Sequence, residues 1–363
     1  MTEFFAVLTA FFIVATATPV IASSAWWVRV FDFPRPQLLV MSSLTVSAEL
    51  VLLEPTAPLT IALATLGSLC AASQLARILP FTPLWRKQVP CATGSGQENS
   101  LGILVANVLT SNRDASLVLA FIEREEPDIV IALETDAWWE KQLNCLQATY
   151  PHTLQCALDN LYGMHLYSRL PLKNPQLEYL VQEGVPSMHA LLQLPCGRHV
   201  LLHALHPAPP FPGENDEAQP RDIEILVVAR SLEKHAGKPV IVAGDMNDVP
   251  WSRTLRGFLA TSGLGDPRRG RGLYNTYHAS HRLMRWPLDH VFVSRHFAVE
   301  RVARSHPIGS DHFAYFTRLR LQPDAPESLT SREDGTEVQQ WAREKIAQGD
   351  VDAADVPDPG APR

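Results

Sequence analysis

Side chains that can bind a metal ion or move a proton lie at the ends of apolar runs throughout residues 100–321. Each run is short and nearly free of charge, which predicts a buried strand. One carboxylate, amide or imidazole follows or precedes each run, and these residues are Asn107, Glu134, His206, Asp245, Asn247, Asp289, Asp311 and His312. Carboxylate and amide oxygens suit a hard cation such as Mg²⁺, and histidine transfers protons near neutral pH. The pattern therefore indicates metal-assisted or acid–base chemistry.

The elements that must position these residues alternate between strands and helices. Apolar runs predict strands at 101–106, 129–133, 162–167, 190–194, 200–205, 240–243, 291–293 and 314–319. Helical periodicity predicts helices at 116–126, 138–147 and 221–235. We expect an α/β (α+β) four-layer sandwich, with two packed mixed sheets flanked by helices. Strand ends that meet at one sheet edge would bring the polar residues together.

Each polar residue also has an ordinary structural explanation. Asp245 and Asn247 fit an Asx turn, and Glu134 fits a carboxylate at a helix N-terminus. His206 fits an exposed loop, and Asp311 with His312 fits a local hydrogen-bonded pair. The occurrence of all of them in one domain favours a functional site.

Three segments carry the most specific signal: Gly244-Asp-Met-Asn247, Leu288-Asp-His-Val291 and Gly309-Ser-Asp-His312. Together with Ser168-Arg-Leu-Pro171, they resemble the endonuclease/exonuclease/phosphatase superfamily, the fold of DNase I. With the apolar N-terminal segments, the chain resembles the membrane-anchored bacterial branch that includes VanJ-type proteins. The resemblance implies a Mg²⁺-dependent phosphoesterase with a sandwich of two mixed sheets, and Mn²⁺ is an alternative metal.

The metal ligands implied by the resemblance are Glu134, Asn107 and Asp311. DNA nucleases of the superfamily usually have Leu-Gln-Glu where this chain has Ala132-Leu133-Glu134. The metal-binding glutamate is kept and the glutamine is lost, which argues more against nuclease specificity than against metal binding.

The catalytic residues implied by the resemblance surround the scissile phosphate. Asp245 would position or deprotonate the attacking water, and Asn247 would donate to a phosphate oxygen. His206 would donate to a phosphate oxygen or to the leaving group. Asp289 would fix the tautomer of His312 beside the phosphate and favour its charged form.

Residues 1–88 are expected to form a membrane anchor. Apolar runs at 4–28, 38–53 and 57–76 predict three transmembrane helices, although the second contains Glu49. Two spans, or a signal peptide followed by core helices, are the alternatives. We expect a multi-pass protein of the bacterial inner membrane.

The side of the membrane that carries the catalytic domain is ambiguous from sequence. Basic residues after the first and third runs place that domain in the cytoplasm by the positive-inside rule. The resemblance to VanJ-type proteins favours the outer face, and we expect that orientation.

The composition supports this division of the chain. The net charge is −7 and only 19% of residues are charged, and the 46% apolar share excludes a disordered protein. Residues 322–363 predict an acidic, mostly disordered tail with one weak helix near 337–348, and residues 89–99 predict a flexible linker. All 13 histidines lie in the catalytic region at 100–321.

Other features leave the substrate open. Seven arginines between residues 253 and 285 suit phosphate, but a basic loop near lipid headgroups explains them as well. Nearby aromatic residues, at 251, 274, 277 and 286, fit either base stacking or packing. Cys145 and Cys156 are spaced for a bridge or remain free thiols.

The leading hypothesis is a membrane-anchored, metal-dependent phosphoesterase whose substrate is a phosphomonoester, a phosphodiester or a lipid-linked pyrophosphate. A nuclease acting on DNA or RNA is the alternative. A non-catalytic binding module is the third possibility.

Overall fold

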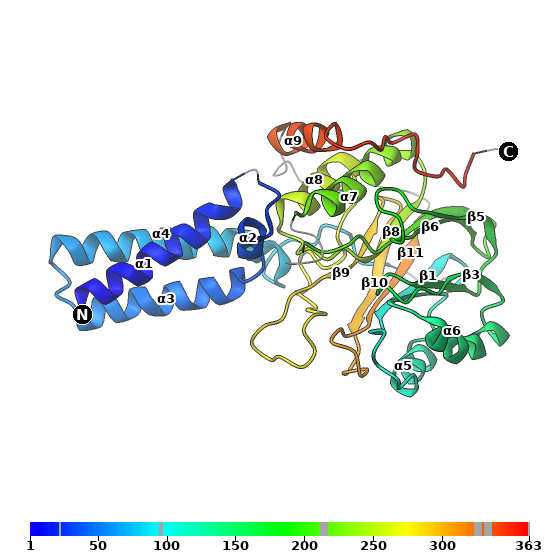
Figure 1. The fold of residues 1–363 in the computed structure, drawn as a ribbon, viewed down its shortest axis with the longest axis horizontal. Helices are drawn as coiled ribbons and strands as arrows, with labels where there is room; N and C mark the ends of the chain where they lie inside the picture. Colours follow the sequence, from blue (N-terminus) through cyan, green and yellow to red (C-terminus); the bar gives the residue numbers. More distant parts are fainter. Residues whose placement is uncertain (22, 94–96, 211–216, 323–328, 330–335, 362–363) are drawn as a thin grey trace.

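The computed structural model describes residues 1–21, 23–93, 97–210, 217–322, 329 and 336–361. Within these residues, two β-sheets pack face to face (Figure 1). The six-stranded sheet has the order β10-β11-β1-β2-β4-β3, with β1 (Ser100–Asn107), β2 (Ile129–Leu133), β3 (His152–Cys156), β4 (Met164–Ser168), β10 (Phe297–Arg304) and β11 (Tyr315–Leu321). The five-stranded sheet has the order β5-β6-β7-β8-β9, with β5 (Leu172–Glu178), β6 (Ser187–Gln193), β7 (His199–Leu205), β8 (Val240–Asp245) and β9 (Asp289–Val293).

Strand alternation separates the core into layers. In β1, Ile103 and Val105 point into the core between the sheets, whereas Leu104 and Ala106 face the opposite side. That opposite face packs against α5 (Ser116–Glu125) and α6 (Ala137–Leu143). The outer face of the other sheet packs against α7 (Gln219–Ser231) and α8 (Arg253–Ser262). The predicted four-layer sandwich is therefore confirmed.

One edge of the sandwich collects the polar strand ends. The central pairs β1–β2 and β7–β8 are parallel, so each pair ends at the same edge of its sheet. The neighbouring strands β11 and β9 are antiparallel to β1 and β8 and therefore begin at that edge. As a result, residues that follow four strands and residues that precede two strands meet in one place.

Three long helices extend from one end of the sandwich (Figure 1): α1 (Thr2–Ala17), α3 (Arg35–Leu52) and α4 (Pro58–Ile78). The segments Thr2–Val20 and Pro58–Phe81 are long and apolar enough to cross a membrane, and only 33% and 28% of their apolar windows are buried. Among the described residues, α3 does not meet this criterion. In α3, Glu49 is fully buried and accepts a hydrogen bond of 2.9 Å from Thr9.

The short helix α2 (Trp26–Arg29) lies where the three helices meet the sandwich (Figure 1). We call α1 to α4 the helical unit. Phe81, at its end, packs with Trp251 and Leu288 of the sandwich.

Three segments differ from expectation. The start of the expected linker is packed, because Val89 is fully buried and Ala92 donates to Val299 of β10. The arginine-rich segment begins as a helix, α8. In the acidic tail, the helix predicted near 337–348 is present as α9 (Thr336–Ile346); it packs on α7 and α8 and buries Ala342 and Ile346, so this part of the tail is folded.

Candidate functional site

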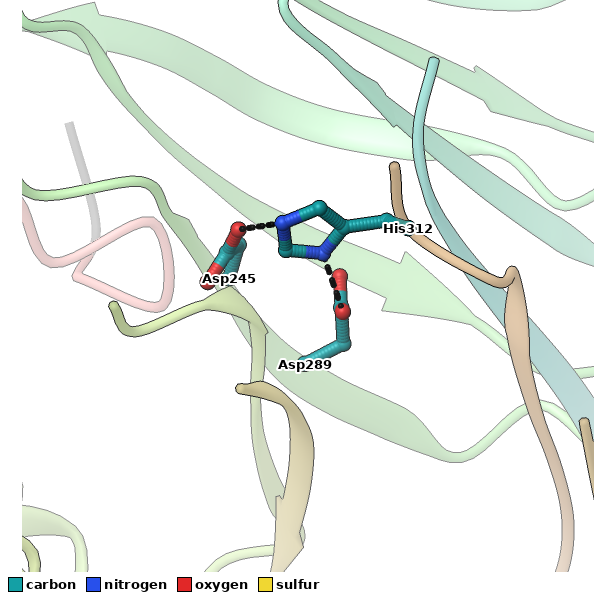
Figure 2. Close-up of side chains that lie close together, drawn as sticks. All are labelled: Asp245, Asp289 and His312. Atoms are coloured by element: carbon teal, nitrogen blue, oxygen red, sulfur yellow. Dashed lines mark hydrogen bonds and ion pairs between the residues drawn. The ribbon is translucent and has the colours of Figure 1, made fainter. Parts of the chain in front are cut away.

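His312 lies between two carboxylates at the edge of the sandwich where the polar strand ends meet (Figure 2). Its Nδ1 is 2.9 Å from Oδ2 of Asp289, and its Nε2 is 3.6 Å from Oδ2 of Asp245. All three side chains are buried. Burial alone would lower the pKa of His312, but Asp289 and Asp245 outweigh that effect and raise the pKa to about 10. The imidazole is therefore positively charged at neutral pH.

Glu134 lies directly after β2, with φ of 59°. Asn107, the last residue of β1, donates from Nδ2 to Oε1 of Glu134 at 2.7 Å and to Oδ2 of Asp245 at 3.3 Å. The Oδ1 atom of Asn107 accepts from the Leu109 N–H at 3.2 Å. Burial raises the pKa of Glu134 to about 7, although the hydrogen bond from Asn107 opposes this shift. Asn107 thus links the Glu134 and Asp245 carboxylates across the two sheets.

Asn247 and His206 complete the edge of the five-stranded sheet. Gly244 has φ of +146°, and a Cβ there would lie 1.9 Å from the Leu205 carbonyl oxygen, so this close approach of β7 and β8 requires glycine. The turn after Gly244 lets Asp245 accept from the Asn247 N–H at 2.9 Å. His206 Nε2 lies 4.0 Å from Oδ2 of Asp245.

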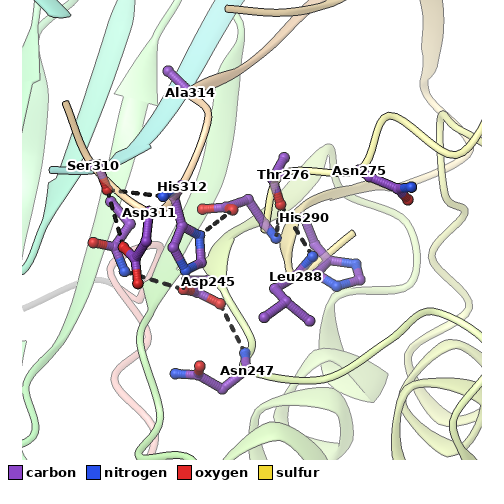
Figure 3. Close-up of polar contacts among 12 residues, drawn as sticks. Asp245, Asn247, Asn275, Thr276, Leu288, His290, Ser310, Asp311, His312 and Ala314 are labelled. Carbon is purple, nitrogen blue, oxygen red and sulfur yellow. Dashed lines mark hydrogen bonds and ion pairs between the residues drawn. The ribbon is translucent and has the colours of Figure 1, made fainter. Parts of the chain in front are cut away.

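Asp311 is partly exposed, and its carboxylate accepts from Ser310 at 3.3 Å. Figure 3 shows it beside His312 on the segment that precedes β11. Its charge contributes to raising the pKa of both His312 and Glu134. The structure therefore brings together all eight residues predicted from sequence.

Carboxylates outnumber positive charges in this group, which we call the acidic cluster (Glu134, Asp245, Asp289, Asp311 and His312). Two buried carboxylate oxygens, Oε2 of Glu134 and Oδ1 of Asp289, have no hydrogen-bond partner within the described chain. Possible ligand atoms of Asp245, Asp289 and His312 also lie within 4.8 Å of one another. The carboxylate oxygens of the acidic cluster fit a divalent cation such as Mg²⁺.

Several supporting residues were not predicted. The Thr276 hydroxyl accepts from the backbone N–H groups of Leu288 and Asp289, each at 3.1 Å, and the Tyr277 ring lies 4.9 Å from that of His312. Ser310 accepts from the His312 N–H at 2.9 Å (Figure 3). Ser310 belongs to a segment that the sequence singled out, whereas Thr276 and Tyr277 lie in a loop without periodicity.

A second group of buried charges holds the helical unit against the turn that follows β8. We call it the junction network, and its members are Arg29, Asp32, Arg35, Arg221, Asp222 and Asp248. Arg29 lies 3.4 Å from Asp32 and 3.8 Å from Asp248. Arg221 lies 3.3 Å from Asp248 and donates to the Asn247 carbonyl at 2.7 Å. The network therefore contacts the backbone of Asn247, one of the predicted site residues.

The arginines and aromatic residues at 251–286 have mostly structural contacts. Arg268 is fully buried, pairs with Asp266 at 2.8 Å and donates to the Asp289 carbonyl. Trp251 donates to the Asp32 carbonyl at 2.7 Å, and Trp286 packs edge-on against Phe33. These contacts use the side chains for packing rather than for base stacking.

The five cysteines are free thiols in the described chain. Cys145 is exposed and Cys156 lies 3.6 Å from the Tyr179 hydroxyl. The structure thus contains no bridge between Cys145 and Cys156.

Comparisons with known proteins agree with this geometry. Residues 104–312 match the model of the Endonuclease/Exonuclease/phosphatase family. A search of curated proteins finds no match. The crystal structure of an endonuclease/exonuclease/phosphatase from Beutenbergia cavernae DSM 12333 is similar, with 21% identity, a TM-score of 0.51, and coverage of 62% of this chain and 72% of that chain.

The D. rerio TDP2 structure complexed with single strand DNA product is also similar, with 16% identity, a TM-score of 0.51, and coverage of 61% of this chain and 99% of that chain. At these identities the two structures show a shared fold. The family match covers more than half of the chain. The chain therefore belongs to the endonuclease/exonuclease/phosphatase family, whose members are metal-dependent phosphoesterases.

Proposed function

We propose that this protein is a membrane-anchored, Mg²⁺-dependent phosphoesterase that hydrolyses its substrate by attack of water. The observation that carries the proposal is the acidic cluster: four carboxylates and one charged imidazole meet at the edge of a phosphoesterase fold. The buried oxygens of Glu134 and Asp289 without hydrogen-bond partners support a cation there.

In this proposal, Glu134 holds the metal, with Asp311 and Asn107 as further ligands. A bound divalent cation would neutralise a phosphoryl oxygen and stabilise the leaving group. Asn107 donates to Glu134 in the structure, so its main part is to orient that carboxylate. We place the metal on this oxygen-rich side because the charged imidazole of His312 has no lone pair to offer.

The remaining residues act on water and phosphate. Asp245 accepts a hydrogen bond from the attacking water and takes its proton. His312, held by Asp289, presents Nε2–H to a phosphate oxygen, and its position beside Asp245 supports this role. Asn247 and His206 donate to phosphate oxygens or to the leaving group.

The helical unit supports membrane anchoring because two of its segments are long, apolar and mostly exposed. An anchored enzyme encounters lipid-linked phosphates at high effective concentration, so we propose a lipid-linked phosphate or pyrophosphate as substrate. We further propose a bacterial inner-membrane location with the catalytic domain on the outer face. A reporter fused after residue 88 distinguishes the two orientations.

The test uses the full chain in detergent or nanodiscs with a panel of phosphate mono- and diesters. We expect Mg²⁺-dependent release of product that stops with EDTA and with Glu134→Ala. Absence of metal-dependent turnover on every ester would refute the enzymatic proposal and favour a binding module.

A nuclease is the second candidate, supported by the similar fold of the TDP2 structure with a single strand DNA product. The structural use of Arg268 and Trp251 argues against it, because a nucleic-acid surface needs such side chains exposed. Degradation of plasmid DNA by the purified protein, without hydrolysis of lipid phosphates, would establish the nuclease instead.

A further inference from the structure

A groove with a volume of about 1040 Å³ lies between α3 and the segment before β9. One wall comes from the first turns of α3, and the other comes from residues 273–275 and 282–285 (Figure 1, yellow loop). Gln37 joins the two walls by donating to the Leu283 carbonyl at 2.7 Å. The groove therefore spans the helical unit and the catalytic domain.

The α3 end of the groove is apolar and open. Val40 and Met41 are 57% and 49% exposed, and across from them Leu283 and Met284 are 85% and 55% exposed. Leu44, one turn beyond Val40 and Met41, is also exposed, so the apolar surface continues along α3. Leu283 and Met284 lie outside the helical unit, so membrane insertion of the helices does not explain their exposure, which marks a binding site for an apolar group.

The side of the groove that faces α3 is also cationic. Arg282, Arg285 and Arg304 line it, and no acidic side chain does so among the described residues. Arg285 donates to the Ala279 and His281 carbonyls, and Arg304 donates to the Asn275 carbonyl. Burial and the neighbouring Arg285 lower the pKa of Arg304.

The side chains of Phe313 and Tyr277 lie between the arginines of the groove and the acidic cluster. Arg285 and Arg304 stack on Phe313 at 5.0 and 4.0 Å, and Phe313 follows His312 in the chain. In the segment before β9, Asn275 lines the groove, and Tyr277, two residues later, packs on the His312 ring. A lipid whose anionic end faces Arg285 and Arg304 would therefore have that end one side chain away from His312.

We propose that this groove binds the hydrocarbon chain of the substrate, a lipid that carries a phosphate group. This inference rests on the proposed function and adds the subsite that selects long-chain over short-chain esters. The chain lies along Val40, Met41, Leu283 and Met284, and the arginines face the anionic part near the active site. A structural membrane lipid would also fit the groove. The closeness of the groove to His312 favours the substrate as its occupant.

Kinetics with long and short esters test the inference. In the full chain, Leu283→Ser combined with Met284→Ser should lower kcat/KM for hexadecyl phosphate about tenfold and leave that for a water-soluble nitrophenyl ester unchanged. Leu117→Ser, at an exposed apolar position on α5, is the matched control and should change neither value. Equal losses on both esters, or no loss on either, would overturn the inference.

A binding measurement keeps the test independent of turnover. A photoreactive hexadecyl phosphate should label residues 36–41 or 273–285 in the Glu134→Gln protein, and unlabelled hexadecyl phosphate should compete better than hexadecanol. Labelling elsewhere, or labelling unaffected by the double serine variant, would contradict the groove assignment. If no ester is hydrolysed but the groove is labelled, the proposed activity fails and a lipid-binding site remains, which identifies a structural lipid and overturns the substrate assignment.

Discussion

The acidic cluster and the junction network are both buried groups of charges, yet their balance differs. The junction network has three arginines and three aspartates, and every carboxylate has a guanidinium within 4.0 Å. The acidic cluster has four carboxylates and one imidazolium. Buried ions are costly unless compensated, so a balanced group can stabilise a junction, whereas an unbalanced group must obtain its positive charge from elsewhere. The imbalance, more than burial, distinguishes the candidate active site.

Removal of a metal-binding carboxylate should give the largest effect. We expect Glu134→Gln to lower turnover of a soluble phosphoester about 10³-fold, because the side chain keeps its volume and loses its charge towards the cation. Steady-state kinetics at saturating Mg²⁺ measures the loss. Stability should hardly change, since the variant removes an uncompensated charge. Turnover close to that of the wild type would show that Glu134 does not bind the metal.

The junction network should respond in the opposite way. Asp248→Asn leaves Arg29 and Arg221 with one carboxylate fewer, and we expect it to lower the free energy of unfolding by about 3 kcal/mol. Denaturant unfolding in detergent measures this effect. Asp289→Asn is the matched control from the acidic cluster and should lose activity with a smaller change in stability. A stable Asp248→Asn protein would mean that the network does not hold the junction.

Glu224, on α7, is a buried carboxyl that belongs to neither group. Burial raises its pKa to about 8, and its Oε1 has no hydrogen-bond partner within the described residues. The folded-state pKa lies above the unfolded value of 4.5, so its contribution to stability is complete below pH 4.5 and is lost as the pH rises through 8. At pH 9, we expect Glu224→Gln to be more stable than the wild type by about 2 kcal/mol.

Unfolding curves at pH 6 and pH 9 test this prediction. The difference between the variant and the wild type should grow between the two pH values. A constant difference would show that Glu224 does not titrate in this range.

The smallest effect concerns the pH dependence of metal binding. A carboxyl must be ionised to bind Mg²⁺, and burial raises the pKa of Glu134 to about 7. We expect the apparent Kd for Mg²⁺ to increase about tenfold between pH 8 and pH 6. Calorimetric titration of the full chain at both pH values measures it, and Glu134→Gln should lose this dependence. A Kd that is constant over this range would place the metal away from Glu134.

Sequence predicted the interior strands well and the edges poorly. The apolar runs predicted every strand that has a neighbouring strand on both sides. Such strands are buried on both faces, which leaves continuous apolar runs such as Ile129–Leu133. The missed strands β3, β5 and β10 all lie at sheet edges, where one side is unpaired and polar residues are tolerated. Helix α8 was missed because Thr254 and Gly257, which have low helix propensity, lie on its buried face, and because its arginines suggested a basic loop.

The same reasoning explains what could be predicted of the site. Asn107, Glu134 and Asp245 were identified because each ends an apolar run, and the topology then brings those ends together. The junction network gave no such signal, since Arg29 lies before the sandwich domain and its partner Asp248 lies after β8, far away in the sequence. Charge compensation between distant segments is visible only after folding.

The junction network also changes how the helical unit should be regarded. A flexible linker lets a membrane-anchored enzyme reach any point within the length of the linker and raises its effective concentration throughout that volume. Here Arg29 pairs with Asp248 in the turn after β8, and Arg35 pairs with Asp32 within the helical unit, so buried ion pairs fix the unit against the sandwich. If the helical unit inserts into a membrane as proposed, the candidate active site is held at one fixed distance from the bilayer, and only phosphate groups presented at that distance are within its reach.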